Sequence, residues 1–203
     1  MLKRFGIMAV IAALAWVPTA HANDVYVEQV GDSAAITILQ DGSSNRIGAD
    51  GTPSIIKGDA NIVTIDQIGS SNTLDMIING AAITATVTTN GSNNIQVINC
   101  GTANSATCGS SFIKQQVDGD NNTVTQNLVA SATQHSEILI TGSENTVTHT
   151  TSGSGAHSAI ITVTGGVALS GNTISLTQGG TNAQQATITS TGNSNAITVN
   201  QSN

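Results

Sequence analysis

The chain has 203 residues, of which 38% are hydrophobic but only 2% aromatic, and its formal net charge at pH 7 is −7. Five basic residues against 12 acidic ones disfavour nucleic-acid binding, because phosphate contacts need clustered Lys or Arg. The same balance disfavours binding to an anionic membrane surface.

Residues 1–22 have the organisation of a secretory signal peptide. A basic start that includes Lys3 precedes an apolar run ending at Val17, and small residues stand at the last and third-last positions before a cleavage point after Ala22. The run is shorter than the ~20 residues that span a bilayer. We therefore expect residues 23–203 to form a single mature domain that is exported via the periplasm without membrane insertion.

The composition of residues 23–203 predicts an ordered β protein. Only Tyr26 and Phe112 remain as aromatic residues, and 12 acidic residues stand against three basic ones. Abundant Gly, Asn and Ser are typical of disorder, but disordered chains lack β-branched residues. Here Thr, Ile and Val are frequent and regularly spaced, which favours strands.

A Gly-x-x-Asn motif recurs along the whole mature chain. From Asn72 onward its Asn residues are spaced by 22, 28, 23, 27 and 23 positions, and insertions account for the two longer steps. The underlying unit is therefore about 22–23 residues. The full copies begin at Gly42, Gly58, Gly69, Gly91, Gly119, Gly142 and Gly192, and looser copies begin at Gly31, Gly153 and Gly180.

Within each unit the side chains alternate with a period of two. Val63, Ile65 and Gln67 share one phase before a motif, and Leu74 and Met76 share it afterwards. Such alternation predicts strands with one buried face. No stretch of the mature chain has a convincing helical period, so the unit is strand, turn, strand and second turn.

One such arc cannot bury its apolar face alone, whereas stacked copies form continuous columns of inward residues. The sequence therefore predicts an all-β solenoid of roughly seven or eight rows. Gly is expected at sharp corners with positive φ, and Asn and Gln are expected to satisfy corner backbone and to bond to their copies in adjacent rows. The residues assigned to these turn and ladder roles are Gly31, Gly42, Asn45, Gly58, Asn61, Gln67, Gly69, Asn72, Gly91, Asn94, Gly119, Asn122, Gly142, Asn145, Asn172, Gln178, Gly180, Gly192, Asn195 and Gln201.

The two cysteines of the chain, Cys100 and Cys108, lie close together in a chain expected to be exported. An oxidising compartment favours a local disulfide between them over redox catalysis, and no CxxC motif is present.

Little in the sequence points to catalysis. His135, His149 and His157 lie within one stretch, but no Cys or carboxylate completes a ligand pattern, so we expect surface histidines and no metal or other cofactor. Asp66 and Asp75 flank one turn on the outward side, as is usual for a solvated face. There is no phosphate loop and no Ser-His-Asp context, and we expect no enzyme.

A different binding function is suggested by outward Thr-x-Thr runs. These runs are Thr84/Thr86/Thr88, Thr146/Thr148/Thr150, Thr162/Thr164 and Thr187/Thr189/Thr191. Stacked rows would turn them into a flat hydroxyl lattice suited to ice or another flat surface. Thr is also simply a good strand former, and Lys114, Gln116 and Leu139 interrupt the lattice.

The repeats resemble those of the curlin family, the subunits of curli functional amyloid, whose pattern is S-x5-Q-x-G-x2-N-x-A-x3-Q. The Q-x-G element occurs at Gln29-Val30-Gly31, Gln40-Asp41-Gly42, Gln67-Ile68-Gly69 and Gln178-Gly179-Gly180, and a closing Gln occurs at Gln40, Gln178 and Gln201. The likeness covers nearly the whole mature chain. It departs from the pattern where aliphatic residues replace the Ala, where Thr89, Val117, Ile140, Val163 or Ser190 replaces the first Gln, and where a long loop runs from Gly48 to Lys57.

This resemblance implies export through a curli-type outer-membrane pore and assembly outside the cell. Subunits of the family add end to end on a nucleator and form cell-surface fibres that support adhesion and biofilm. A last strand that has no charge, Pro or capping helix is expected to leave its edge open for a further copy. The alternatives are the ice- or surface-binding solenoid and a minor or nucleating adhesin subunit that does not polymerise.

Overall fold

The computed structural model describes residues 22–32, 34–49, 51–52, 54–58, 61–79, 82–100, 108–129, 132–165 and 171–203. The predicted signal peptide, residues 1–22, lies outside the described residues except for its last residue, Ala22. Among the described residues there is no helix, so none is long and apolar enough to cross a membrane.

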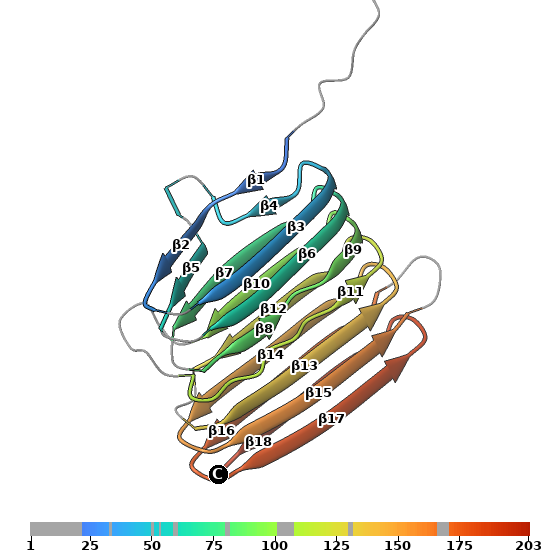
Figure 1. Ribbon diagram of the computed structural model, residues 1–203. Coiled ribbons are helices and arrows are strands. Elements are labelled where there is room, and N and C mark those ends of the chain that lie inside the picture. Colours follow the sequence, from blue (N-terminus) through green and yellow to red (C-terminus); the bar gives the residue numbers. More distant parts are fainter. Residues whose placement is uncertain are drawn as a thin grey trace, which may run out of the picture.

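The chain coils into a parallel β-solenoid of about seven turns with about 23 residues per turn, which confirms the predicted fold (Figure 1). Two sheets face each other, and the chain passes from one to the other and back in each turn, with β1 and β2, β4 and β5, and β8 and β9 dividing one pass into two short strands. The first sheet holds β1 (Asp24–Val25), β2 (Val27–Val30), β4 (Arg46–Ile47), β5 (Ser54–Lys57), β7 (Thr73–Asn79), β10 (Ile95–Cys100), β12 (Thr123–Leu128), β14 (Thr146–Gly153), β16 (Thr173–Gly180) and β18 (Ala196–Ser202). The second holds β3 (Ala35–Ser43), β6 (Ile62–Ser70), β8 (Thr84–Thr86), β9 (Thr89–Ser92), β11 (Val117–Asp118), β13 (Gln134–Thr141), β15 (His157–Thr164) and β17 (Gln184–Thr191).

The strand register reproduces the spacing read from the sequence. Thr73 of β7 pairs with Ile95 of β10, and Thr123 of β12 pairs with Thr146 of β14. All ladders between named strands are parallel, so equivalent side chains lie above one another in columns. The solenoid runs from β1 at one end to β17 and β18 at the other, where the chain ends (Figure 1).

Each turn has two corners, which differ in chemistry. The GxxN corner leads from the second sheet to the first, for example from β6 through Gly69 to β7. The return corner leads from the first sheet to the second, for example from β16 through Gly180 to β17. The two corners alternate along the chain.

The core is the thin space between the sheets, and it is filled by the predicted inward phase. Val63, Ile65, Leu74 and Met76 are all fully buried. One apolar cluster occupies the N-terminal rows and a second, which includes Ile138 and Leu176, occupies the C-terminal rows.

The segment from Gly48 to Lys57, predicted as a long loop, is only partly one. Its second half, Ser54–Lys57, forms β5 and pairs with both β2 and β7. The inward residue Ile56 is fully buried. The burial of this strand alternates, but its sequence places two Ile residues side by side after Gly and Pro, so the period of two could not be recognised.

Candidate functional site

The GxxN corner carries a continuous ladder of Asn side chains along the solenoid axis. In each step the Oδ1 atom of one Asn accepts the backbone N–H and the side-chain amide of the Asn in the next row. From Asn72 to Asn94 these two distances are 3.1 and 3.0 Å. The ladder contains Asn45, Asn72, Asn94, Asn122, Asn145, Asn172 and Asn195, and all but Asn195 are completely buried. The predicted amide ladder is confirmed.

The ladder Asn side chains also bond to the backbone of the corner in the next row. The side-chain amide of Asn72 donates to the carbonyl of Gly91 at 2.8 Å, and that of Asn94 donates to Gly119 at 2.7 Å. These contacts satisfy carbonyls that the turn would otherwise leave unpaired and buried. The Asn side chain therefore joins neighbouring rows both through the ladder and through the corner backbone of the next row.

Sequence reasoning missed one member of this ladder. Asn23 accepts the backbone N–H of Asn45 through its Oδ1 atom at 3.0 Å, so the ladder begins one row earlier than predicted. Asn23 has no Gly three residues before it. Its spacing of 22 residues from Asn45 is the signal that could have identified it.

The corner glycines are required by both backbone conformation and space. Gly69 has a φ of +111°, and a Cβ atom there would lie 2.0 Å from the carbonyl oxygen of Gly91. Gly42, Gly91 and Gly119 have positive φ and would bring a Cβ equally close to the next row. Rows can approach this closely only because the glycines stack without side chains.

The corner contains a second left-handed position that the motif did not reveal. In six of the seven ladder rows from Asn45 to Asn195, the residue just before the Asn is not Gly and has a φ between +57° and +62°; the exception is Asn172, which follows Gly171. These residues are Ser44, Ser71, Asn93, Asn121, Glu144 and Ser194. Asn tolerates this conformation better than Ser or Glu, so the corner holds some backbone strain.

Four predicted residues, Gly31, Gly58, Asn61 and Gly180, lie at the return corner instead of the GxxN corner. The two corners share the need for Gly, and the three glycines have positive φ. Asn61, however, bonds locally to the carbonyls of Lys57 and Gly58, each at 2.9 Å, and its neighbour in the next row is Ile83. Asn61 therefore has the predicted turn role but does not belong to the ladder, because the same four-residue pattern suits either corner.

Two glutamine pairs lie near the ends of the solenoid, apart from a pair in the middle rows in which Gln115 donates to Gln96 at 2.6 Å. Gln40 donates to Gln67 at 2.7 Å in the first rows, and Gln178 donates to Gln201 at 2.9 Å in the last rows. In both pairs the side chain nearer the N-terminal end is the donor. In the rows between Gln67 and Ser190 the inward column is filled by Thr89, Val117, Ile140 and Val163.

The expectation that the histidines lie on the surface is wrong for His149 and His157. Both are inward, with relative exposures of 1% and 2%. Only His135 points outward, where it contacts the Phe112 ring. Histidine fits the strand period in either phase, so the alternation rule alone did not decide which face it occupies.

His149 belongs to a directional chain of side-chain hydrogen bonds inside the core. Gln126 donates to the hydroxyl of Ser136, which lies 2.9 Å from His149 Nδ1, while His149 Nε2 lies 3.1 Å from Gln178 Oε1. Because Gln178 Oε1 can only accept, the proton of the neutral ring is on Nε2. Burial is the main cause that lowers the pKa of His149 to about 4. The hydrogen bond to Gln178 raises this pKa, and the charge of His157 lowers it.

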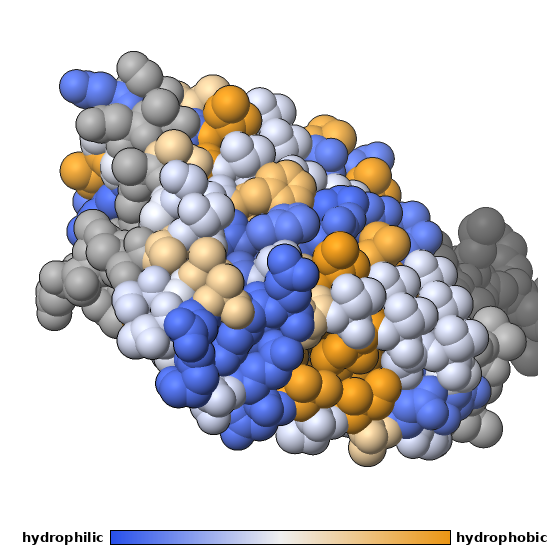
Figure 2. Space-filling view, turned by 90° about the horizontal axis from the view of Figure 1, so that it is seen from below, coloured by the Kyte–Doolittle hydropathy of each residue, from blue (hydrophilic) through white to orange (hydrophobic). Residues whose placement is uncertain are grey.

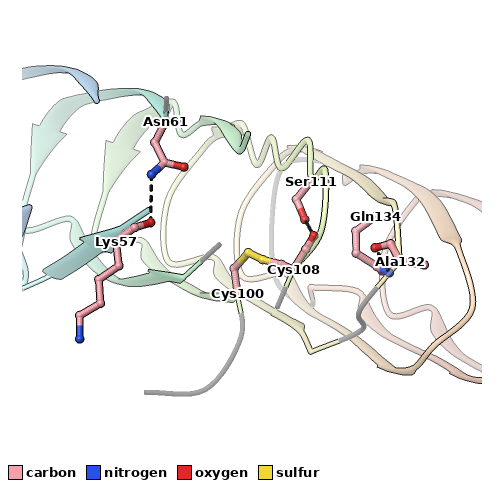
Figure 3. The surroundings of a disulfide bond; sticks show 7 residues. All are labelled: Lys57, Asn61, Cys100, Cys108, Ser111, Ala132 and Gln134. Carbon is pink, nitrogen blue, oxygen red and sulfur yellow. Dashed lines mark hydrogen bonds between the residues drawn. A yellow bond between two sulfur atoms is a disulfide. The ribbon is translucent and has the colours of Figure 1, made fainter. Parts of the chain in front are cut away.

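A disulfide joins Cys100 and Cys108, whose Cα atoms are 5.6 Å apart. Figure 3 shows it near the return corner, with the Asn61 amide bonded to the Lys57 carbonyl and the Ser111 hydroxyl bonded to the Cys108 carbonyl. Both sulfur-bearing residues are completely buried. The bond closes the insertion that lengthens this turn.

The Thr-x-Thr runs do not share one face. Thr84/Thr86, Thr162/Thr164 and Thr187/Thr189 lie on the second sheet, whereas Thr146/Thr148/Thr150 lie on the first. On the second sheet Glu137 and Ile160 separate the Thr residues of one column. The more regular array is on the first sheet, where Thr123, Thr146 and Thr173 are consecutive in one column and Thr125, Thr148, Ser175 and Thr198 in another.

No protein-family model, no curated protein and no solved structure matches this chain. The geometry of the ladders and the strand edges at the two ends therefore carry the functional argument.

Proposed function

We propose that this chain is a structural, non-catalytic subunit of an extracellular amyloid-like fibre of the curli type, in which copies add end to end. The observation that carries this proposal is the in-register stacking of rows, with Asn ladders along the axis and strands at both ends that no described residue covers. In the order of the sheets, β1 and β3 begin the stack and β17 and β18 end it. The same interactions that hold one row on another can hold one copy on the next.

The hydrogen-bonding pattern of the two ends is complementary. Outward-facing residues donate toward the C-terminal end, as Thr173 does to the Asn195 carbonyl at 2.8 Å. Inward-facing residues donate toward the N-terminal end, as Val117 does to Thr88 at 2.9 Å. A head-to-tail junction therefore brings each set of edge groups against its natural partner, and growth in one direction does not close on itself.

The remaining parts of the proposal follow from the likeness to curlin repeats. The subunit would leave the cell through a curli-type outer-membrane pore, start on a nucleator and contribute to adhesion and biofilm matrix. The Q-x-G-x-x-N corners at Gln40–Asn45 and Gln67–Asn72 support it, because they form the curlin-like turns of the first rows.

The test uses purified protein that begins at Asn23. We expect unseeded protein to form fibres visible by electron microscopy, with dye-binding fluorescence that rises after a lag and an ordered ~4.8 Å repeat along the fibre axis. Preformed fibres should remove the lag. Protein that stays monomeric for days at high concentration, with and without seeds, would refute the proposal.

The Thr array on the first sheet favours a second candidate, binding to ice or another flat surface. Its columns would present hydroxyl groups every ~4.8 Å along the axis and every second residue along the strand. Thermal hysteresis in a monomer solution, lost when Thr148 is replaced by Tyr, would support this function. A third candidate, a minor subunit that only binds fibre ends, would bind preformed fibres without elongating them.

A further inference from the structure

The two sheets of the solenoid have unequal numbers of rows. The main path of the first sheet is β1-β4-β7-β10-β12-β14-β16-β18, which is eight levels, whereas the path β3-β6-β9-β11-β13-β15-β17 of the second has seven. The described chain therefore begins and ends on the same sheet. The described part of one copy is a whole number of turns plus one strand.

The extra strand level in the first sheet decides how two copies can fit together. If the next copy were only translated along the axis, its β1 and β2 would lie on β18, and its β3 would lie two levels beyond β17. One strand position in the second sheet would stay empty, leaving the edges of β17 and β3 unpaired and their apolar side chains apart. If the next copy is also rotated by half a turn, its β1 and β2 fill the level above β17 and its β3 lies on β18.

We infer that copies stack head to tail with a half-turn rotation about the solenoid axis, so that each sheet of the fibre alternates between the two sheets of successive subunits. This inference rests on the proposed fibre function and specifies its subunit contact. Strands of the two sheets run in opposite directions across the solenoid, and the half-turn restores parallel pairing. The coil then continues without a missing or an extra strand.

The inward side chains match in this arrangement. On β18, Ile197, Val199 and Gln201 meet Ile36, Ile38 and Gln40 of the next copy. On β17, Ala186, Ile188 and Ser190 meet Val25, Val27 and Gln29 of the next copy. Ala186, Ile197, Val199, Ile36, Ile38 and Val27 are only partly buried in the single chain. Figure 2, viewed from the C-terminal end, shows groups of apolar side chains exposed on this face beside polar ones.

The glutamine pairs give this contact a direction. The core chain that passes through His149 and Gln178 reaches Gln201 at the C-terminal end. At the N-terminal end Gln40 donates to Gln67, and Gln40 Oε1 accepts no hydrogen bond from the described residues. The half-turn places Gln201 beside Gln40 of the next copy, so its amide can donate to that oxygen. Four glutamines then form one ladder with a single direction of donation.

Charge also favours contact between opposite ends. Residues 171–203 contain no Asp, Glu, Lys or Arg. The first rows carry Asp24, Glu28 and Asp41, and in the half-turn register these acids lie beside Gln185, Thr189 and Ser202 of the preceding copy. Contact between two N-terminal ends would instead bring like charges together in edge strands, which is destabilising.

The Asn ladder at the GxxN corner, taken alone, favours the arrangement in which the next copy is translated without rotation. Translation would place Asn23 of the next copy above Asn195 and continue the Asn ladder, whereas the half-turn places Ala34 there. The backbone N–H of Ala34 can still donate to Asn195 Oδ1, because ladder rows are joined by a backbone donor as well as by the amide. The half-turn therefore loses one amide contact but gains a complete row of strand pairing.

Two double-cysteine variants distinguish the arrangements within fibres. Thr198→Cys/Thr37→Cys places the thiols in adjacent strands only after a half-turn, and Thr198→Cys/Tyr26→Cys does so only after translation. Adjacent parallel strands are ~4.8 Å apart, within the Cα range of a disulfide. In one chain these positions lie at opposite ends, roughly 30 Å apart at that strand spacing, so any new disulfide joins two copies.

Fibres of each variant are grown in reductant, oxidised mildly and examined on denaturing gels. We expect a ladder of covalent oligomers from the Thr198/Thr37 variant, and only monomer from the Thr198/Tyr26 variant and from the three single-cysteine controls. The reverse pattern would establish translation and overturn the half-turn while leaving the fibre function intact. Fibres that cross-link through neither pair would also overturn it, and the absence of fibres in the unmodified protein would refute the fibre function itself.

Discussion

The Oδ1 atom of Asn72 accepts two hydrogen bonds from Asn94, one from its backbone N–H and one from its side-chain amide, at 3.1 and 3.0 Å. Asn72 repeats this relation toward Asn45 as the donor. Because both side chains are completely buried, water cannot replace either partner. The row-to-row contact at this corner therefore depends on an unbroken series of amides.

Replacing Asn72 with Ala should lower the free energy of unfolding by on the order of 3 kcal/mol. The change removes side-chain bonds to Asn45, Gly91 and Asn94 and leaves buried groups unpaired at about 1 kcal/mol or more each. Urea unfolding of the monomer measures it. Asn99→Ala is the matched control, because Asn99 lies on the outward face of the neighbouring strand, and it should change stability by less than about 0.5 kcal/mol.

Gly69→Ala should be far more destabilising than Gly51→Ala. Both glycines have positive φ, +111° at Gly69 and +76° at Gly51. A Cβ atom at Gly69 would lie 2.0 Å from a backbone oxygen, whereas a Cβ atom at Gly51 would have nothing within 4 Å. We expect about 1 kcal/mol for Gly51→Ala from conformation alone, and at least several times that for Gly69→Ala. Thermal unfolding followed by circular dichroism gives the comparison; similar melting temperatures for the two variants would contradict the close stacking of corners.

Stability should fall as the pH drops from about 6.5 toward 4. Burial lowers the pKa of His149 from 6.5 to about 4, so the unfolded chain binds a proton in this window and the folded chain does not. The stability that the neutral ring contributes is complete above pH 6.5 and is lost progressively below it. The loss amounts to about 3 kcal/mol, because each unit of pKa shift is worth ~1.4 kcal/mol. Urea unfolding between pH 7 and 4 measures the loss.

His149→Gln removes this titration while keeping an amide that suits the polar chain, since Gln126 already occupies the same inward column. Its stability should vary little over the same pH range. His135→Gln is the control for a histidine on the outward face and should retain the pH dependence of the unmodified protein. Equal pH dependence in His149→Gln and the unmodified protein would refute the assignment.

Thr198→Pro should leave the monomer folded but stop growth at the C-terminal end. Outward-facing residues of each row donate toward this end, as Thr173 does to Asn195, so Pro at Thr198 removes a donor that only an added copy would use. Elongation from labelled seeds, viewed by microscopy, should become one-sided. Ile197→Pro, one residue earlier, removes a bond to β16 and should destabilise the monomer itself.

The repeat could be predicted correctly because its signals are local. The first corner position combines positive φ with close approach of the next row and so requires Gly, and the buried corner favours an amide. Gly42-x-x-Asn45 and its copies can therefore be recognised without knowing the fold. The alternation of Val63, Ile65 and Gln67 set the phase of the strands in the same way. Where a local pattern fits two places equally well, as Gly58–Asn61 does, the sequence could not choose between the corners.

By itself, then, the sequence determined that this chain stacks strand-turn-strand units, with Gly and Asn at the corners and aliphatic side chains inside. Only the tertiary structure decided what depends on neighbours from other rows: that Asn23 belongs to the ladder, that His149 and His157 are buried, and that Gln178 bonds to Gln201. It also decided that the described chain begins and ends on the same sheet. The physical reason is that these properties depend on which row lies above which, and that is fixed by the pairing of strands distant along the chain.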